Sequence, residues 1–264
     1  MPAIALFCSI SPSLGHPLTI LHTEASTGWG GQEIRVFTEL TAMRRRGHRM
    51  LLAAPPSSQI FQQAEAAKFH PWPLDLRKPL YPLTIVRLAR WISREQVDVV
   101  NPHSSADGWL AGLAGRAAGV PLIVRSRHIE VDYPHWRTSR WAFGRLPHHV
   151  ITTSKGISKH LVEALRLKAD HVTCIPTGID TKRFHPNTHG NLHEELGLPA
   201  ETQLLGMVAV LRSWKGHEYF IRAAGRMERA KPHLVIAGEG TQARKMKIQQ
   251  WAKEAGGANR LHML

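Results

Sequence analysis

The sequence is poor in cysteine and has no long apolar run. Cys8 and Cys174 are the only cysteines among its 264 residues, and no C-x-x-C pair is present. So few thiols argue against a disulfide framework or a thiolate zinc site and suit a reducing cytoplasm. No apolar run approaches the ~20 residues that a membrane-spanning helix needs. The apolar start, Pro2–Ile10, is short and lacks a basic leader, so we expect no signal peptide.

Acidic residues are also scarce, since 20 Asp and Glu stand against 34 Lys and Arg, and the formal net charge is +14. This balance predicts attraction to polyanions, such as nucleic acid, anionic lipid headgroups or phosphate-bearing substrates. No D-x-D cluster offers carboxylates to Mg²⁺ or Mn²⁺, and the G-x-S-x-G and G-x-x-x-x-G-K-[ST] motifs are absent. His185, His189 and His193 have the spacing of helical metal ligands, but Pro186 and Gly190 disfavour a helix there. We therefore expect no metal site.

The apolar pattern alternates between strand and helix periods along the chain. Leu18–Thr23 reads as a strand, a glycine turn ends at Gly31, and apolar residues then recur at helical spacing until Gly47, before a strand at Arg49–Ala54. Such a βαβ unit, repeated, predicts an α/β fold with a doubly wound parallel sheet that binds ligands at the carboxyl ends of its strands. The later elements expected are helices Leu83–Ser93 and Asp107–Ala118, strands Val97–Val100, Pro121–Arg125 and His149–Thr153, and a helix capped by Ser154 that runs to Leu167.

A proline-bounded stretch, Val172–Pro186, divides the chain. It begins as a strand, breaks at Pro176 and runs extended into a polar segment, which is how one α/β domain ends before another begins. The strand and helix cycle then restarts with strands Leu204–Val210, His233–Ala237 and Leu261–Leu264 and helices His217–Arg229 and Thr241–Ala255. The sequence predicts a loose extension over residues 1–17, a first domain over 18–183, a linker over 184–199 and a second domain over 200–264. Only 65 residues follow Pro199, where ~100–150 are common, so we expect the second domain to be incomplete.

Two turns between a strand and a helix carry residues that suit a phosphate. At Gly30-Gly31 the backbone could approach a ligand, and the free N–H groups of the helix start favour an anion or sugar hydroxyls. Arg212 and Lys215 place two cations beside a second helix start, which suits a diphosphate. The alternatives are a tight turn without a ligand for Gly30-Gly31 and a solvated basic turn for the Arg212–Gly216 loop.

Three further features are less specific. His128 follows a predicted strand and could donate a hydrogen bond to a reacting sugar or orient it, and His103 follows the neighbouring strand. With 17 histidines in the chain, either could be an ordinary exposed side chain. Gly238-x-Gly240-x-x-Ala243 matches the dinucleotide fingerprint, although the confirming acidic residue would lie beyond Leu264.

The segment Tyr133–Arg145 combines aromatic and basic residues. Trp and Phe at headgroup depth with Arg on phosphates would let it rest on an anionic bilayer, while an ordinary surface helix is an equal alternative. For Leu83–Arg94, which is similar in composition, we favour the ordinary surface helix. The residues of the proposed membrane or acceptor surface are Arg137, Arg140, Trp141 and Arg145.

Eight motifs occur in one order at plausible spacings. They are G-G-x-E (Gly30–Glu33), R-G-H (Arg46–His48), D-V-V-N-P-H-S (Asp98–Ser104), R-S-R-H (Arg125–His128), T-T-S-K-G-I-S (Thr152–Ser158), I-P-T-G-I-D-T-K-R-F-H-P (Ile175–Pro186), V-L-R-S-W-K-G (Val210–Gly216) and L-V-I-A-G-E-G (Leu234–Gly240). With them the chain resembles the retaining glycosyltransferases of the GT-B fold, most closely family 4, from about Leu18 to Leu264. The resemblance implies two Rossmann-like domains that face a cleft, the first for the acceptor and the second for a nucleotide-diphosphate sugar.

The resemblance also implies roles for particular residues. Arg212, Lys215 and Gly216 would bind the donor diphosphate and offset the charge on the leaving group without a metal. Gly30 and Gly31 would close on the donor, and His128 would be the active-site histidine that contacts the transferred sugar. The further sugar or acceptor contacts expected are His103, Arg127 and Glu239.

The expected reaction moves a hexose-type sugar from a UDP- or GDP-sugar, as co-substrate rather than cofactor, to a saccharide or lipid-linked acceptor of the cell envelope or lipopolysaccharide. We expect a protein of the cytoplasm, or of the inner face of the cytoplasmic membrane, with no nucleic-acid partner. Three departures from the family pattern stand out: Thr177-Gly178 replaces Asn-Gly, the Arg212–Lys215 loop is short, and the acidic motif E-x7-E would lie beyond Leu264, so we expect a C-terminally truncated chain. The alternatives are an NAD-binding oxidoreductase, based on Gly238-x-Gly240, and a basic nucleic-acid-binding module, against which the dispersed charge and the lack of a reading motif argue.

Overall fold

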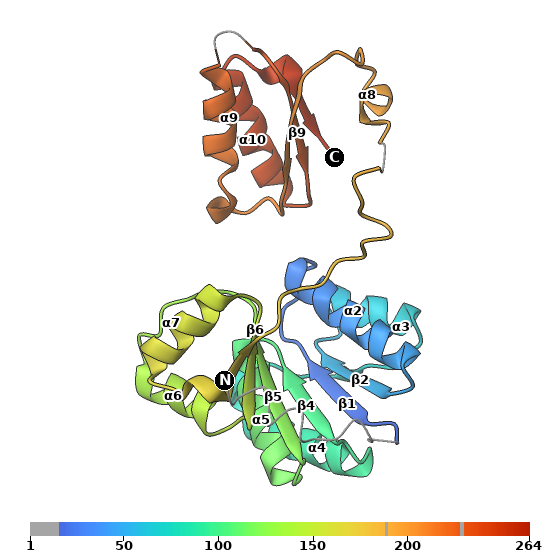
Figure 1. Cartoon of the computed structure of the whole chain (residues 1–264), viewed down its shortest axis with the longest axis vertical. Coiled ribbons are helices and arrows are strands. Elements are labelled where there is room, and N and C mark those ends of the chain that lie inside the picture. Colours follow the sequence, from blue (N-terminus) through green and yellow to red (C-terminus); the bar gives the residue numbers. More distant parts are fainter. Residues whose placement is uncertain (1–15, 188–189, 228–229) are drawn as a thin grey trace. The chain divides into compact units, whose positions relative to one another are not determined.

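The computed structural model describes residues 16–187, 190–227 and 230–264 (Figure 1). Most of the expected N-terminal extension and His189 therefore lie outside the described residues. The chain divides into two compact units, Met1–Gly178 and Ile179–Leu264, and each is described here by itself. Both are α/β, as the alternating periodicity predicts.

The first unit is built on a seven-stranded sheet in the order β3-β2-β1-β4-β5-β6-β7, with all strand pairs parallel. From β1 the strand order runs through β2 to β3 at one edge of the sheet, and from β4 it runs through β5 and β6 to β7 at the other edge. The direction therefore reverses between β1 and β4, and such a switch point is where ligands bind in sheets of this kind. The strands are β1 Thr19–Thr23, β2 Arg49–Ala54, β3 Trp72–Pro73, β4 Val99–Pro102, β5 Leu122–Arg127, β6 His149–Thr152 and β7 Val172–Cys174.

Helices cover both faces of this sheet, and neighbouring residues of β1 show why. Ile20 packs in a core with α2 and α3, whereas Leu21 packs in a separate core with α4 and α5 (Figure 1). Side chains alternate between the faces of a strand, so a strand covered on both sides buries successive residues, and in β1 these include the polar His22 and Thr23 toward its carboxyl end. The helices are α2 Gly31–Arg45, α3 Gln59–Ala66, α4 Tyr81–Arg94, α5 Ser105–Ala117, α6 Trp136–Gly144 and α7 Lys155–Leu165, with short 3-10 turns at Lys78–Leu80 and Ala169–His171.

Helix starts follow the predicted capping chemistry. The hydroxyl of Ser154 accepts the backbone N–H of Ile157 at 3.2 Å, which confirms the expected cap of α7. Ser58 caps α3 in the same way, through the N–H of Phe61 at 3.3 Å. Neither α3 nor the two-residue strand β3 is expected from the sequence, although Ser58 is a typical helix-start signal.

The second unit has a parallel sheet in the order β10-β9-β8, formed by β10 Leu261–Met263, β9 His233–Ala237 and β8 Leu204–Val208. The helices α9 His217–Gly225 and α10 Gln242–Glu254 pack on it, with 3-10 turns at Ser213–Lys215 and Ala258–Arg260. Its buried core consists of Leu211, Ile221, Ala224, Leu234, Ile236, Ile248, Trp251 and Ala252.

Several boundaries differ from those expected. The strand predicted to reach Val210 ends at Val208, although the N–H groups of Ala209 and Leu211 still donate to the carbonyls of Ala237 and Glu239 in the paired loops that follow. In the predicted linker, α8 Leu192–Glu195 forms one helical turn. His193 belongs to this turn and His185 precedes it, so these two do not share a helix. None of the described helices is both long and apolar enough to cross a bilayer.

Candidate functional site

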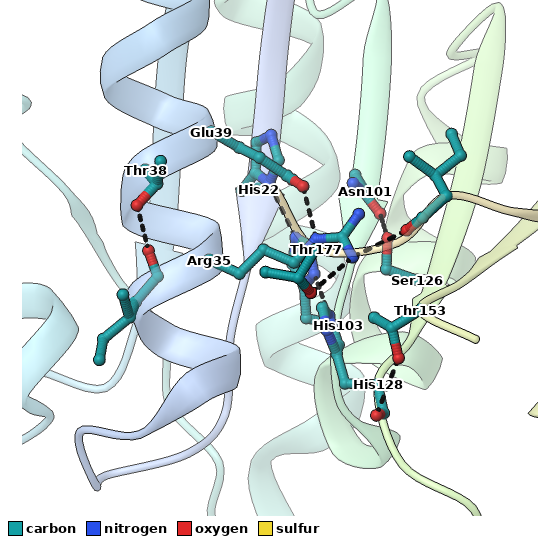
Figure 2. A network of polar contacts seen from close by, with 12 residues as sticks. His22, Arg35, Thr38, Glu39, Asn101, His103, Ser126, His128, Thr153 and Thr177 are labelled. Carbon is teal, nitrogen blue, oxygen red and sulfur yellow. Dashed lines mark hydrogen bonds and ion pairs between the residues drawn. The ribbon is translucent and has the colours of Figure 1, made fainter. Parts of the chain in front are cut away.

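Three histidines form a continuous chain of hydrogen bonds at the carboxyl edge of the first sheet (Figure 2). His22 lies in β1, His103 follows β4 and His128 follows β5. Nδ1 of His22 is 2.7 Å from Nε2 of His103, and Nδ1 of His103 is 2.9 Å from Nε2 of His128. The rings of His22 and His103 stack with their centroids 5.0 Å apart. The structure thus joins His103 and His128, which the sequence suggests as sugar contacts, and adds His22.

Burial divides the three rings. His22 and His103 are 4% and 2% exposed, whereas His128 is half-buried. Desolvation lowers the pKa of His22 and takes that of His103 well below its usual value. Burial, with the charges of Arg35 and Arg127, lowers the pKa of His128 to about 4. All three rings are therefore neutral at pH 7.

Arg35 and Glu39, one turn apart on α2, border this chain. The Nε of Arg35 donates to Oε1 of Glu39 at 2.7 Å, and one terminal nitrogen of Arg35 donates to the carbonyl of Ile175 at 3.0 Å and to the hydroxyl of Thr177 at 3.2 Å. Arg35 is buried and Glu39 is partly exposed. The guanidinium lowers the pKa of each histidine, while the carboxylate of Glu39 raises that of His22. The sequence places both residues only on a predicted helix, so their proximity to the histidines could not be predicted.

A buried carboxylate holds the loop that carries His103. Oδ2 of Asp107 accepts the hydroxyl of Thr23 at 2.8 Å and the backbone N–H of His103 at 3.0 Å. Its Oδ1 accepts both the backbone N–H and the hydroxyl of Ser104, which form a capping box at the start of α5. Asp107 thereby fixes the end of β1 to the end of β4.

Glu24 is fully buried directly after β1. Its Oε1 accepts the backbone N–H groups of Ala25 at 2.9 Å and Ser26 at 2.8 Å, and Gln32 donates to Oε2. Burial, and next the charge of Asp107, raises the pKa of Glu24 to about 7. No motif in the sequence points to Glu24, although it directly follows the first predicted strand.

The glycine turn opens α2 as expected. Oε2 of Glu33 accepts the backbone N–H of Gly30 at 2.8 Å. A side chain at Gly31 would meet nothing within 4 Å, so packing does not explain this glycine and the space in front of it is open. Near the same edge, Arg127 is buried and its Nε finds no partner in the described part of the chain, while its guanidinium carbon is 5.8 Å from the centre of the Tyr133 ring.

In the second unit, Arg212 and Lys215 lie in the loop that joins β8 to α9, at the carboxyl edge of its sheet. Both are exposed, and Arg212 stacks over the exposed Trp214 at 5.4 Å. Gly216 has φ 82°, a left-handed conformation that favours glycine, and it is the N-cap of α9. Glu239 is exposed in the neighbouring loop after β9, so it shares this edge with the two cations.

Packing accounts for the glycines of the dinucleotide-like motif. A side-chain carbon at Gly238 would lie 2.0 Å from the carbonyl oxygen of Ala209, and one at Gly240 would lie 2.4 Å from the Cβ of Leu211. The two loops approach each other so closely that neither position accepts a side chain. Their glycines therefore need no nucleotide to explain them.

The four residues of the expected membrane surface lie together on or next to α6. Arg137, Arg140, Trp141 and Arg145 are all exposed and line one cavity of about 800 Å³. The remaining lining residues are Gly144, His148, His149, Arg166, Leu167, Lys168, Asp170 and His171. Since His149 begins β6 and His171 precedes β7, this cavity opens at the amino edge of the sheet, whereas His128 lies at the carboxyl edge.

One group of side chains in the described residues could hold a metal ion. A ring nitrogen of His22, one of His103 and a carboxylate oxygen of Glu39 all lie within 4.8 Å of one another. Such a nitrogen and oxygen set would suit zinc. A metal there would have to break the His22–His103 hydrogen bond or the Arg35–Glu39 ion pair, and this site differs from the one considered in the sequence.

The architecture is that of the GT-B glycosyltransferases. A glycosyltransferase of Rickettsia africae superposes with a TM-score of 0.79 at 16% identity over 94% of this chain and 68% of that one. The HepE protein of Anabaena, solved with UDP and glucose, superposes with a TM-score of 0.76 at 17% identity over 94% and 69%.

The family follows from the sequence match. Residues 29–183 match the model of Glycosyltransferase Family 4, and residues 189–264 match that of Glycosyl transferases group 1. The chain belongs to glycosyltransferase family 4.

Two further relatives are longer proteins than this chain. The UDP-Gal:alpha-D-GlcNAc-diphosphoundecaprenol alpha-1,3-galactosyltransferase of Escherichia coli is 28% identical over 53% of this chain and 39% of its own length. A D-inositol 3-phosphate glycosyltransferase of Segniliparus rotundus is 22% identical over 80% of this chain and 54% of its own length. The chain thus spans between about two fifths and about half of these relatives.

Proposed function

We propose that the protein transfers a hexose-type sugar from a nucleotide-diphosphate sugar to a saccharide or lipid-linked acceptor, with retention of configuration and without a metal. The observation that carries this proposal is the Arg212–Gly216 loop, which sets two exposed cations at the start of α9 in a chain of family 4. The free N–H groups of a helix start and two cations together suit a diphosphate.

The cations would act mainly as the bond to the donor sugar breaks. Negative charge then grows on the departing diphosphate, and Arg212 and Lys215 stabilise it more strongly than they stabilise the bound donor. Exposed cations can take this part because the diphosphate itself removes them from water when it binds. In this account the two side chains supply the charge that a metal supplies in other transferases.

His128 would contact the transferred sugar from the first unit. It is half-buried and neutral at pH 7, so it offers a hydrogen bond rather than a charge. Gly31 would let the backbone approach the donor, in keeping with the open space before it. His103 would act through His128, while Arg127 and Glu239 remain candidate contacts of the sugar or the acceptor.

A lipid-linked acceptor of the cell envelope is consistent with the basic cavity beside α6. The E. coli relative is named for a diphosphoundecaprenol acceptor. Exposed tryptophan and arginine side chains at Trp141, Arg140 and Arg145 suit a membrane surface rich in anionic headgroups. The cavity lies at the sheet edge opposite to His128, so it would dock the protein on the inner face of the membrane rather than hold the reacting hydroxyl.

The proposal is tested by thermal shift with UDP, GDP, ADP and NAD⁺ in turn. A ligand at 100 times its Kd stabilises the folded state by ~2.7 kcal/mol, enough to be seen as a rise in Tm. We expect UDP or GDP to stabilise the parent chain and to leave the R212A/K215A variant unchanged.

The matched control is K247A/K253A, which removes the same charge from exposed positions on α10 of the same unit. It should keep the response to the nucleotide. Stabilisation by NAD⁺ alone would contradict the proposal and favour a dinucleotide enzyme. An equal loss of the nucleotide-induced rise in Tm in both double variants would show that binding depends on net charge rather than on this loop.

A further inference from the structure

The hydrogen bonds between the three histidines at the carboxyl edge constrain which nitrogen of each ring carries its proton. Each neutral imidazole carries one N–H, and each hydrogen bond needs one donor and one acceptor. In this chain both ring nitrogens of His103 are used, one toward His22 and one toward His128. His103 can therefore donate to only one neighbour and must accept from the other.

Only two neutral arrangements satisfy both hydrogen bonds. If Nδ1 of His22 carries its proton, His103 must accept at Nε2 and donate from Nδ1, and His128 must accept at Nε2 and keep its proton on Nδ1. If Nδ1 of His22 accepts, each of the three rings is protonated on Nε2 instead. The tautomer of His22 thus determines that of His128, two rings away.

The charges around the chain favour the second arrangement. In the second arrangement the outermost proton of the chain lies on Nε2 of His22, whereas in the first it lies on Nδ1 of His128. The carboxylate of Glu39 acts on His22 and attracts the proton to the His22 end. The guanidinium of Arg127 acts on His128 and repels a proton there. Arg35 disfavours a positive charge on all three rings, so the rings stay neutral and both hydrogen bonds donate in the same direction along the chain.

We propose that His22 and His103 are positioning residues that hold His128 in the Nε2–H tautomer, so that His128 presents an unprotonated Nδ1 as a hydrogen-bond acceptor for a substrate hydroxyl. The hydroxyl is that of the transferred sugar, and this part rests on the proposed function. Within the described residues, Nδ1 of His128 has no hydrogen-bond partner and is not among the buried atoms left unpaired, so it is reachable from solvent. A protonated Nδ1 could not accept a hydrogen bond from the hydroxyl. It would donate to the hydroxyl oxygen instead and so favour a different orientation of the sugar.

The tautomers are read directly from ¹⁵N chemical shifts of histidine-labelled protein, because protonated and unprotonated ring nitrogens resonate far apart. Signals are assigned with single histidine variants. We expect His22, His103 and His128 to show Nε2–H with a free Nδ1 in the absence of any ligand. This readout does not depend on which reaction the protein catalyses.

Two variants test the positioning role. H22F keeps a ring that can stack on His103 but removes its hydrogen bond, so His128 should show a second population with Nδ1–H. E39Q removes the carboxylate at a partly exposed position and should shift the same balance without disturbing the core. The matched control is E218Q, which breaks the equivalent Arg222–Glu218 ion pair on α9, where none of the three histidines lies, and should change none of their signals.

Several results would overturn the proposal: all three rings protonated on Nδ1, a His128 tautomer that H22F and E39Q leave unchanged, or stoichiometric metal in the purified chain whose removal shifts the signals of His22 and His103. A separate arm adds UDP-glucose, with UDP as its control. A shift of the His128 Nδ1 signal with UDP-glucose alone supports the hydroxyl contact. Its absence, with the tautomers as expected, would count against the sugar contact and leave the relay intact.

Discussion

In the first unit most polar groups at the carboxyl edge of the sheet are buried and bonded to one another, whereas in the second unit they are exposed and separate. His22 and His103 are almost fully buried, and their hydrogen bonds join them to each other and to His128. Arg212 and Lys215 face solvent and make no ion pair with any described carboxylate. A buried network fixes geometry in advance, and exposed cations supply a field that the ligand completes.

The largest effect should come from breaking the histidine network. H103A removes two hydrogen bonds and a stacked ring and leaves polar atoms of His22 and His128 unpaired, so we expect a loss of about 4 kcal/mol in unfolding free energy. Urea denaturation measures the loss, and hydrogen exchange of the β1 and β4 amides locates it. H262A is the control, since His262 pairs with His233 in a partly exposed site at 2.8 Å and should cost less than about 1 kcal/mol.

A second comparison separates glycines that packing requires from a glycine that we propose to face a ligand. G238A would drive a methyl group into the carbonyl oxygen of Ala209 at a residue with φ 156°, so we expect a loss of about 3 kcal/mol in the second unit. G31A meets open space on a helix and should keep the stability of the first unit or raise it by up to ~1 kcal/mol. Thermal unfolding measures both. A stable G238A would show that the two loops can separate.

Glu24 gives a pH-dependent test of burial in the first unit. Its pKa is raised from 4.5 to about 7 in the folded state, so the folded chain holds a proton there that the unfolded chain releases. That contribution to stability is complete below pH 4.5 and is lost as pH rises through about 7. E24Q should therefore be more stable than the parent at pH 8, by on the order of 2 kcal/mol, and no more stable at pH 4.5. A stability difference between parent and E24Q that is the same at pH 4.5 and at pH 8 would mean that folding does not raise the pKa of Glu24.

The smallest effects per residue are expected at the basic cavity, whose side chains are exposed. R137A/R140A/R145A should weaken binding to vesicles that contain phosphatidylglycerol by about five-fold for each arginine, because a surface cation contributes about 1 kcal/mol there. Cosedimentation with neutral vesicles gives the baseline. R87A/R90A/R94A removes the same charge from α4 and should bind as the parent does. If both triple variants weaken equally, net charge rather than this cavity directs the contact.

The sequence predicts elements better than it predicts contacts between them. Apolar periodicity and the Ser154 cap place α7 correctly, and residues past strand ends identify His103 and His128. The sequence does not identify His22 as a site residue because it lies inside a strand, where its position indicates nothing beyond partial burial. Its partner is 81 residues away, and only the parallel register of β1 with β4 brings the two together.

Two other misses have different causes. The strand Trp72–Pro73 is too short, and contains a proline, so no periodic pattern could show it. Gly238 and Gly240 match a motif whose usual cause is a ligand, while here the close approach of a neighbouring loop requires glycine. Side-chain patterns do not distinguish these two reasons for the same residue.

Arg35 connects the histidines to the place where the chain leaves the first unit. The same guanidinium that pairs with Glu39 also holds the carbonyl of Ile175 and the hydroxyl of Thr177. A pull on the segment after β7 would draw this charge away from the imidazoles and change the electric field across them. The vibrational and NMR frequencies of His128 would then report tension in the chain beyond Thr177, with no probe attached to the second unit.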